Sequence, residues 1–209
     1  MASRIQTPLL AADSSPALFD ASSQRENRRQ LILEAAATLF RNKGYAGTSM
    51  RDIAAISGLL PGSIYFHFPS KEDIFLAVQK QGIEHLIDAV QAAMRDIPEP
   101  WARLEAACIA HMIGILDESG LAAALVNVTS ARSLDAWNQI AALRDEYEKH
   151  FRQLVDDLPL PAGTNRKYLR LALLGSMNWT HSWYRRGRDT PKQLAVEIVW
   201  LYRCGLDPE

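Results

Sequence analysis

The 209-residue sequence contains only two cysteines, Cys108 and Cys204, and they belong to no metal or redox spacing. It has no apolar run near the roughly 20 residues of a membrane-spanning helix. Its first residues lack the charged head and long apolar core of a secretion signal. These absences predict a reduced, cytoplasmic protein without a membrane partner; a disulfide between the two cysteines is an unsupported alternative.

Catalytic and metal-binding motifs are also missing. The sequence has no nucleophile elbow, no phosphate-binding glycine loop and no paired-cysteine motif. Among the histidines, only His111 is spaced to share a helix face with a cysteine, Cys108, and a packed thiol beside a hydrogen-bonded histidine is favoured over a metal pair. We expect no catalytic residues, no metal and no cofactor, and therefore a protein that is not an enzyme.

No segment alternates apolar and polar residues as a strand would, and no internal repeat is present, so the fold class is all-α. Residues 1–23, rich in Ala, Ser and Pro, are expected to be a flexible arm. A capping-box spacing of Ser23 and Glu26 then predicts the start of the first helix. A three-helix domain is expected over residues 24–70 and a helical-bundle domain over residues 71–209.

Two short helices joined by a tight turn are predicted between residues 48 and 68. Ser49 and Asp52 have capping-box spacing and open a helix of about 49–56. Gly58 permits the turn, and Pro61 suits the first position of a second helix of about 61–67. The residues expected to face inward are Met50, Ile53, Ala54, Ile56, Ile64 and Phe68. A second helix this short can enter a DNA major groove end-on.

The charge of this region supports a nucleic-acid partner, although the whole chain has a net charge of only −1. Residues 24–71 contain seven Lys or Arg against three acids, a net +4. The basic residues suited to phosphates are Arg25, Arg28, Arg29, Arg51 and Lys71. A charge cluster alone is more often a solvated helix face, but the adjoining turn and helix favour DNA.

The motifs of this region resemble the DNA-binding domain of the tetracycline-repressor (TetR) family. They are Leu39-Phe40, Gly-Tyr-x-Gly-Thr-Ser from Gly44, Asp-Ile-Ala from Asp52, Ser57-Gly58, and Gly-Ser-Ile-Tyr-x-His-Phe-x-Ser-Lys-Glu-Asp from Gly62. The resemblance implies a helix-turn-helix domain followed by a ligand-binding and dimerisation domain. It also implies a dimeric transcriptional regulator, usually a repressor that leaves a pseudo-palindromic operator in double-stranded DNA when a small molecule binds.

The DNA-binding residues expected on this basis fall into two groups. Phosphate contacts are expected from Arg28, Thr48, Arg51, Tyr65, His67 and Lys71, and base contacts from Leu59, Leu60, Pro61, Gly62 and Ser63. Leu60 stands where the family often has Ser or Thr, and Pro61 where it frequently has Lys or Arg. Because no side chain in this set has the bidentate reach of Arg or Asn, we expect DNA shape and backbone contacts to supply much of the specificity.

The last two predicted helices are the candidate dimer interface. A helix within 166–186 carries the stripe Ala172, Gly175, Ser176, Trp179 and Trp183, and a helix opened by Thr190 and Gln193 carries a broad apolar surface. In the family resembled, the last two helices of each subunit form a four-helix interface. A homodimer also places two reading helices about one DNA turn apart, whereas in a monomer these helices would only complete the core.

Residues 178–187 resemble a signature of TetR-like regulators that respond to acyl-CoA thioesters of lipid or steroid breakdown. The resemblance implies that the ligand is bound by Asn178, Trp179, Trp183, Arg185 and Arg186, although Arg186 stands where the signature usually has Pro. The alternative is a packed aromatic core with helix-end arginines. A second functional alternative is a DNA-anchored protein-interaction module without an effector. A pocket beside Trp179 and Trp183 would favour the ligand.

Overall fold

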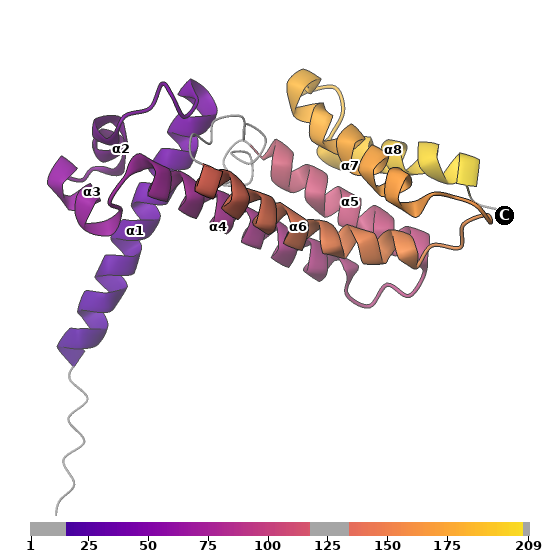
Figure 1. Cartoon of the computed structure of the whole chain (residues 1–209), viewed down its shortest axis with the longest axis horizontal. Helices are drawn as coiled ribbons and strands as arrows, with labels where there is room; N and C mark the ends of the chain where they lie inside the picture. The colour runs from indigo at the N-terminus through magenta and orange to yellow at the C-terminus, as the bar shows by residue number, and fades with distance from the viewer. Residues whose placement is uncertain (1–15, 118–133, 207–209) are drawn as a thin grey trace, which may run out of the picture.

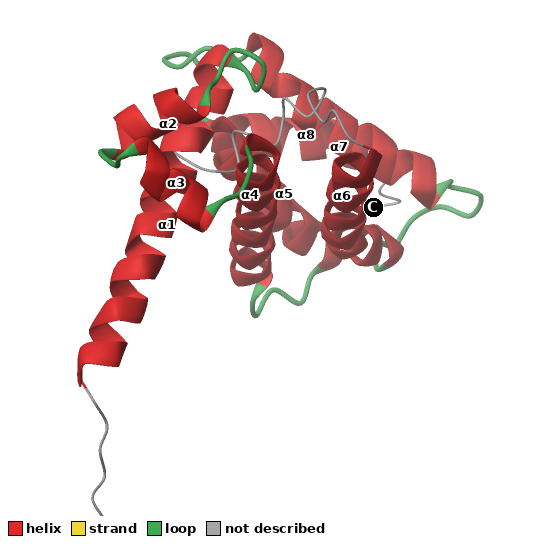
Figure 2. Cartoon of the chain, turned by 60° about the vertical axis from the view of Figure 1, so that its left-hand side comes forward, coloured by secondary structure: helices red, strands yellow, loops and turns green. Residues whose placement is uncertain are grey.

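The computed structural model describes residues 16–117 and 134–206, which fold into helices with no strand among them (Figures 1 and 2). This confirms the all-α fold class. None of the described helices is long and apolar enough to cross a bilayer. The helices are α1 (Pro16–Lys43), α2 (Met50–Ser57), α3 (Pro61–His67), α4 (Lys71–Met94), α5 (Pro100–Leu116), α6 (Leu134–Asp156), α7 (Arg166–Trp183) and α8 (Pro191–Leu206).

The N-terminal part, which we call the head, consists of α1, α2, α3 and the first turns of α4. Its core contains buried Ile32, Ile53 and Ile64, with no exposed surface. Three aromatic rings join α1, the following loop and α4: Phe40, Tyr45 and Phe75 lie with centroids 5.0–5.6 Å apart. The short helices α2 and α3 are therefore held against α1 and α4 by apolar packing.

Two details of the predicted head are wrong. The helix α1 begins at Pro16 and runs through Ser23, so the Ser23–Glu26 spacing does not mark its start. Residues 1–15 of the predicted arm lie outside the described residues. In α2, Ile53 and Ala54 are buried as expected, but Ile56 is 55% exposed because it lies on the opposite side of the helix.

The C-terminal part, which we call the bundle, is built around α5, which contacts α4, α6, α7 and α8 (Figure 1). Its core includes buried Trp101, Phe151 and Met177. Four helices, α5 to α8, follow Pro98 in the described residues.

Head and bundle share two helices. The start of α4 contributes Ile74 and Val78 to the head core, and its later turns contribute Leu86 to the bundle core. In the same way α6 contributes Ile140 to the head core and Phe151 to the bundle core. The helices α4 and α6 therefore provide a packed connection through which a displacement within the bundle can be transmitted to the head.

Candidate nucleic-acid interface and ligand cavity

The helix pair α2 and α3 has the local geometry that the sequence predicts. Ser49 Oγ accepts a hydrogen bond from the Asp52 backbone N–H at 3.1 Å, and the Asp52 carboxylate accepts one from the Ser49 N–H at 2.9 Å. The Asp52 carboxylate also accepts a hydrogen bond from the Ser49 hydroxyl at 2.7 Å, and this bond, together with the one from the Ser49 N–H, lowers the pKa of Asp52. Gly58 has a φ of 69°, which ends α2 and starts the turn, and Pro61 occupies the first turn of α3.

The outward face of α3 and of the residue before it is apolar and strongly exposed. Leu60 is 77% exposed and Phe66 is 71% exposed, and Tyr65 also faces solvent. Ile64, with no exposed surface, anchors the helix from the other side. Of the residues predicted to face bases, Leu60, Pro61 and Gly62 are exposed, and Leu59 and Ser63 are partly buried, with Leu59 packed against the head core. The base contacts stay predictions, and Leu60, Pro61 and Gly62 are the most accessible residues of the set.

Arginines of α1 lie against the end of α3. The guanidinium of Arg25 lies 5.2 Å from the centroid of the Phe66 ring, and that of Arg29 lies 5.1 Å from the Phe68 ring. Partial burial lowers the pKa of His67, and the charges of Arg25, Arg28 and Arg29 lower it further. This basic cluster joins residues of α1 to residues 39 or 41 positions later in the sequence, and both Arg28 and the more distant Arg51 are exposed.

Thr48 and Lys71 have structural roles that the sequence did not reveal. Thr48 is 2% exposed, and its hydroxyl donates to the Gly44 carbonyl at 2.9 Å. The Lys71 ammonium donates to the carbonyls of Tyr45 and Thr48, both at 2.7 Å, and lies 4.2 Å from the centroid of the Tyr45 ring. These interactions fasten the loop between α1 and α2, and the phosphate contacts expected of the two residues stay predictions.

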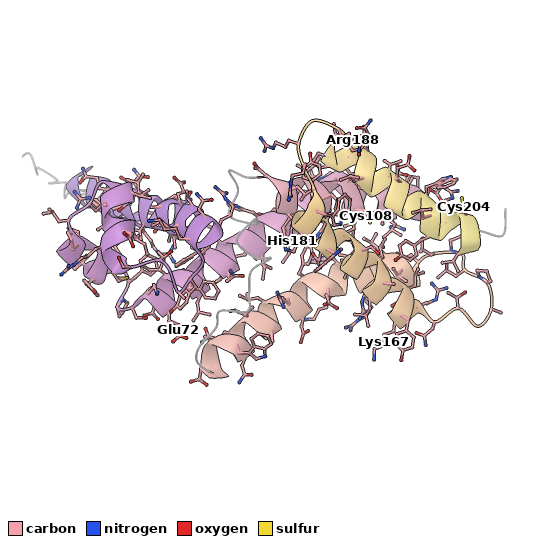
Figure 3. All side chains as sticks on the ribbon, turned by 90° about the horizontal axis from the view of Figure 1, so that it is seen from above. Glu72, Cys108, Lys167, His181, Arg188 and Cys204 are labelled. Atoms are coloured by element: carbon pink, nitrogen blue, oxygen red, sulfur yellow. The ribbon has the colours of Figure 1, made fainter. Side chains whose placement is uncertain are left out.

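A cavity of about 340 Å³ lies within the bundle between α4, α5, α6 and α7. Its apolar wall is formed by Ile83, Leu86, Ile115 and Leu174. The other lining residues are His111, Arg144, Tyr147, Glu148, Gly175, Asn178, Trp179 and His181. Figure 3 marks His181 on α7 and Cys108 on α5. The cavity thus offers an apolar body and a limited set of polar groups, as small-molecule sites do.

The polar wall contains a buried pair. His111 Nδ1 and the Tyr147 hydroxyl are 2.7 Å apart, and the two rings stack with centroids 5.7 Å apart. Burial lowers the pKa of His111 to about 4, an effect that the nearby Asn178 side chain opposes. Burial also raises the pKa of the Cys108 thiol. The described residues contain no cluster of three His, Cys, Asp or Glu suited to a metal, and the hydrogen-bond partner of His111 Nδ1 is the Tyr147 hydroxyl.

The structure places only some of the predicted ligand residues at the cavity. Asn178 and Trp179 line the cavity, but Trp183, Arg185 and Arg186 do not. Trp183 is 49% exposed at the end of α7, and Arg186 lines a separate hollow with Arg188, which Figure 3 labels in the loop after α7. The residues from α4, α5 and α6 were missed, because their meeting at one cavity depends on how the helices pack.

The outer face of α7 and α8 carries large exposed apolar side chains. On α7 they are Tyr168, Leu171, Trp179 and Trp183, and on α8 they are Trp200 and Leu201. The predicted stripe of small and aromatic residues on α7 is exposed, apart from the partly buried Ser176, whose hydroxyl lies 2.9 Å from that of Tyr202. Clustered apolar surface of this kind is typical of sites that bind another protein, a membrane or a ligand.

Comparisons with known proteins match both parts of the fold. The family described as "Bacterial regulatory proteins, tetR family" matches residues 32–78, and the one described as "Tetracyclin repressor-like, C-terminal domain" matches residues 98–206. The HTH-type transcriptional repressor KstR2 of Mycobacterium tuberculosis (strain ATCC 25618 / H37Rv) is 27% identical over 198 residues, which cover 90% of this chain and 97% of KstR2.

Two solved structures show the same fold. The crystal structure of AibR in complex with isovaleryl coenzyme A and operator DNA has a TM-score of 0.74 at 24% identity, covering 83% of this chain and 97% of AibR. The crystal structure of the superantigen PfiT has a TM-score of 0.72 at 31% identity, covering 88% of this chain and 98% of PfiT. The similarity therefore extends over head and bundle together.

Proposed function

The chain belongs to the TetR family of transcriptional regulators, and we propose that it is a cytoplasmic repressor that leaves its operator when a small molecule of the acyl-CoA class enters its cavity. Members of this family are regulators and not enzymes, and the chain shares that character. The observation that carries the proposal is the position of the cavity, which lies against the two helices, α4 and α6, that continue into the head.

The head supplies the DNA-binding part of this proposal. Arg28 and Arg51 are exposed and serve as phosphate contacts, with Tyr65 and His67 at the far end of α3. Leu60, Pro61, Gly62 and Ser63 face the major groove, where Leu60 can touch a thymine methyl group. Since none of these four offers a bidentate hydrogen bond, discrimination rests largely on DNA shape and backbone contacts.

The second part of the proposal is a homodimer formed through α7 and α8. Exposed Trp200 and Leu201 on α8 and exposed Trp183 on α7 give apolar surface that a second copy would bury. Sedimentation at micromolar concentration should show a dimer, and Leu201→Glu should shift it to a monomer that no longer binds DNA. The exposed Arg152→Glu on α6 is the matched control. A wild-type monomer would contradict this part.

Effector binding in the cavity acts on the DNA-binding head through helices that belong to both parts. Ile83 and Leu86 on α4 line the cavity, and Ile74 of the same helix lies in the head core. Tyr147 on α6 lines the cavity, and Ile140 of α6 lies in the head core. A ligand that separates α4 from α6 would shift the head and change the spacing of the two α3 helices in the dimer.

The class of ligand is inferred from the cavity and from a relative. A volume of about 340 Å³ is at the small end of the range of about 300–1,000 Å³ for ligand pockets, so it suits an acyl group rather than a whole acyl-CoA. The nucleotide would then lie outside, where Arg185 and Arg186 follow α7 and can meet its phosphates. AibR, a structural neighbour, is named in a complex with isovaleryl coenzyme A.

The test is release of DNA by acyl-CoAs. Fluorescence anisotropy of an operator fragment bound to the protein is followed while acyl-CoAs of increasing chain length are added, with free coenzyme A as the control. Release by an acyl-CoA but not by coenzyme A would support the proposal. No release and no heat of binding at any chain length would contradict it and favour the alternative, a DNA-anchored protein-interaction module. The cavity favours the ligand-responsive repressor, and the exposed face of α7 and α8 is compatible with both the repressor and the protein-interaction module.

A further inference from the structure

The buried pair of His111 and Tyr147 leaves one polar atom of the cavity wall unmatched. His111 is 2% exposed, its Nδ1 is taken by the Tyr147 hydroxyl, and its Nε2 is buried without a hydrogen-bond partner. An unmatched buried polar atom costs free energy, so its retention in a ligand cavity needs a reason. Both residues line the cavity, as does Asn178, whose side chain is near enough to the ring to raise the His111 pKa through hydrogen bonding, although no hydrogen bond of full geometry reaches Nε2.

The hydrogen bond between His111 and Tyr147 favours the tautomer with the proton on Nε2. If the Tyr147 hydroxyl donates to Nδ1, the imidazole proton sits on Nε2, and only that N–H lacks a partner. If Nδ1 donates instead, both the hydroxyl hydrogen and the Nε2 lone pair lack partners among the described residues. The first arrangement leaves one group unmatched rather than two, so Nε2 is a hydrogen-bond donor.

The charge state of the ring agrees with this assignment. Because burial lowers the pKa of His111 to about 4, the imidazole is neutral near pH 7 and offers a single N–H. The Asn178 amide, on α7, can add a second donor from the neighbouring turn of the wall. Across the cavity lie Leu86 and Ile115, which offer no polar group.

We propose that the effector carries a carbonyl oxygen that accepts hydrogen bonds from His111 Nε2 and the Asn178 amide, while its apolar body lies against Leu86 and Ile115. Tyr147 is the positioning residue, because it holds the imidazole in the donating tautomer. This inference deepens the proposed function and rests on it in one respect only, that the cavity is the effector site. The carbonyl can be a ketone on the acyl group or the thioester carbonyl itself.

Two matched pairs of probes separate these sources. Cyclohexanone is compared with methylenecyclohexane, which has nearly the same shape and no acceptor oxygen. Isovaleryl-CoA is compared with its thioether, S-isopentyl-CoA, which lacks only the carbonyl. Calorimetric titration of the full-length protein should show the carbonyl member binding about tenfold more tightly in at least one pair, as one neutral hydrogen bond in a buried site implies. The pair that shows the preference identifies the carbonyl.

A spectroscopic measurement tests the tautomer directly. Nitrogen-15 NMR of histidine-labelled protein should show His111 protonated at Nε2 in the free protein, and its Nε2 resonance should move when the preferred carbonyl probe binds. The exposed His85 on α4 should not respond. Tyr147→Phe should leave the affinity for methylenecyclohexane or S-isopentyl-CoA unchanged and reduce the carbonyl preference severalfold.

Three results would overturn the inference: a free protein protonated at Nδ1, equal affinities within both pairs, or a carbonyl preference that persists in His111→Phe. The inference is also overturned if one pair does not bind and the two members of the other pair bind with equal affinity. The DNA-release assay is independent of these measurements. Release by acyl-CoA without a carbonyl preference would reject this inference alone, and a carbonyl preference without release would reject the proposed function alone.

Discussion

Replacing Lys71 by Met gives the sharpest test of how the head is built. The change removes the ammonium and keeps most of the aliphatic stem, so it deletes two hydrogen bonds, to the carbonyls of Tyr45 and Thr48, and the contact with the Tyr45 ring. Hydrogen bonds from charged groups contribute about 1.5–3 kcal/mol each, and an exposed cation–π contact contributes about 0.5–1 kcal/mol. Because Lys71 is only partly buried and water can reach the freed carbonyls, we expect a loss of about 2–3 kcal/mol in the free energy of unfolding.

The assay must separate a fold-stabilising role from a phosphate contact. Urea unfolding at fixed protein concentration gives the stability, and the slope of log K against log salt for DNA binding counts the phosphates neutralised. Lys71→Met should lower stability and leave the slope unchanged. The exposed Arg51→Met is the matched control, which should reduce the slope by about 0.9 and change stability by less than about 0.5 kcal/mol.

The opposite pattern would refute this account of Lys71. A Lys71→Met protein as stable as wild type, with a slope smaller by about 0.9, would show that the ammonium binds phosphate in the complex and that its contacts with the loop are dispensable.

Three further predictions follow from the bundle and from α3. Since His111 has a pKa of about 4 in the folded protein against an ordinary value of 6.5, the unfolded chain binds more protons between these values, and the free energy of unfolding should fall as pH drops from about 6.5 to about 4. The loss should be on the order of 3 kcal/mol relative to His111→Gln in urea unfolding at several pH values, and parallel pH profiles would contradict it. A Cβ at Gly114 would overlap Leu86 Cδ2, so Gly114→Ala should turn the Leu86 side chain toward the cavity and weaken acyl-CoA binding in calorimetry, with a stability cost of about 1–2 kcal/mol. Gly205→Ala, which has open space, is its control, and an unchanged affinity in Gly114→Ala would argue against the cavity as the ligand site. Leu60→Ala and Ser63→Ala should each weaken operator binding by less than about tenfold without altering the footprint, whereas a large loss tied to one base pair would show direct readout.

The features that could be predicted from the sequence are those fixed by neighbours along the chain. The capping box of Ser49 and Asp52, the turn at Gly58 and the first-turn proline of α3 all depend on residues within a few positions, and all are confirmed. The Thr190 and Gln193 capping spacing is also confirmed at the start of α8. Local spacing is ambiguous, however, because Ser23 and Glu26 have the same spacing inside α1.

The features that could not be predicted depend on packing between distant residues. Lys71 reaches the Tyr45 carbonyl 26 positions earlier, and His111 meets Tyr147 36 positions later. Neither pairing leaves a pattern in the sequence, because a lysine at the start of a helix and a histidine within one have many possible partners. The cavity illustrates the same limit, since only Asn178 and Trp179 among its lining residues were expected to bind the ligand.

The central claim is that α2 and α3 are presented to an operator twice by a symmetric dimer, and selection of bound fragments from genomic DNA tests it most directly. The full-length protein, without ligand and at low ionic strength, should retain fragments that share a pseudo-palindromic site, with half-sites separated by one helical turn of about 34–36 Å or a multiple of it. Failure to retain any fragment, or retention without a shared site, would contradict the claim.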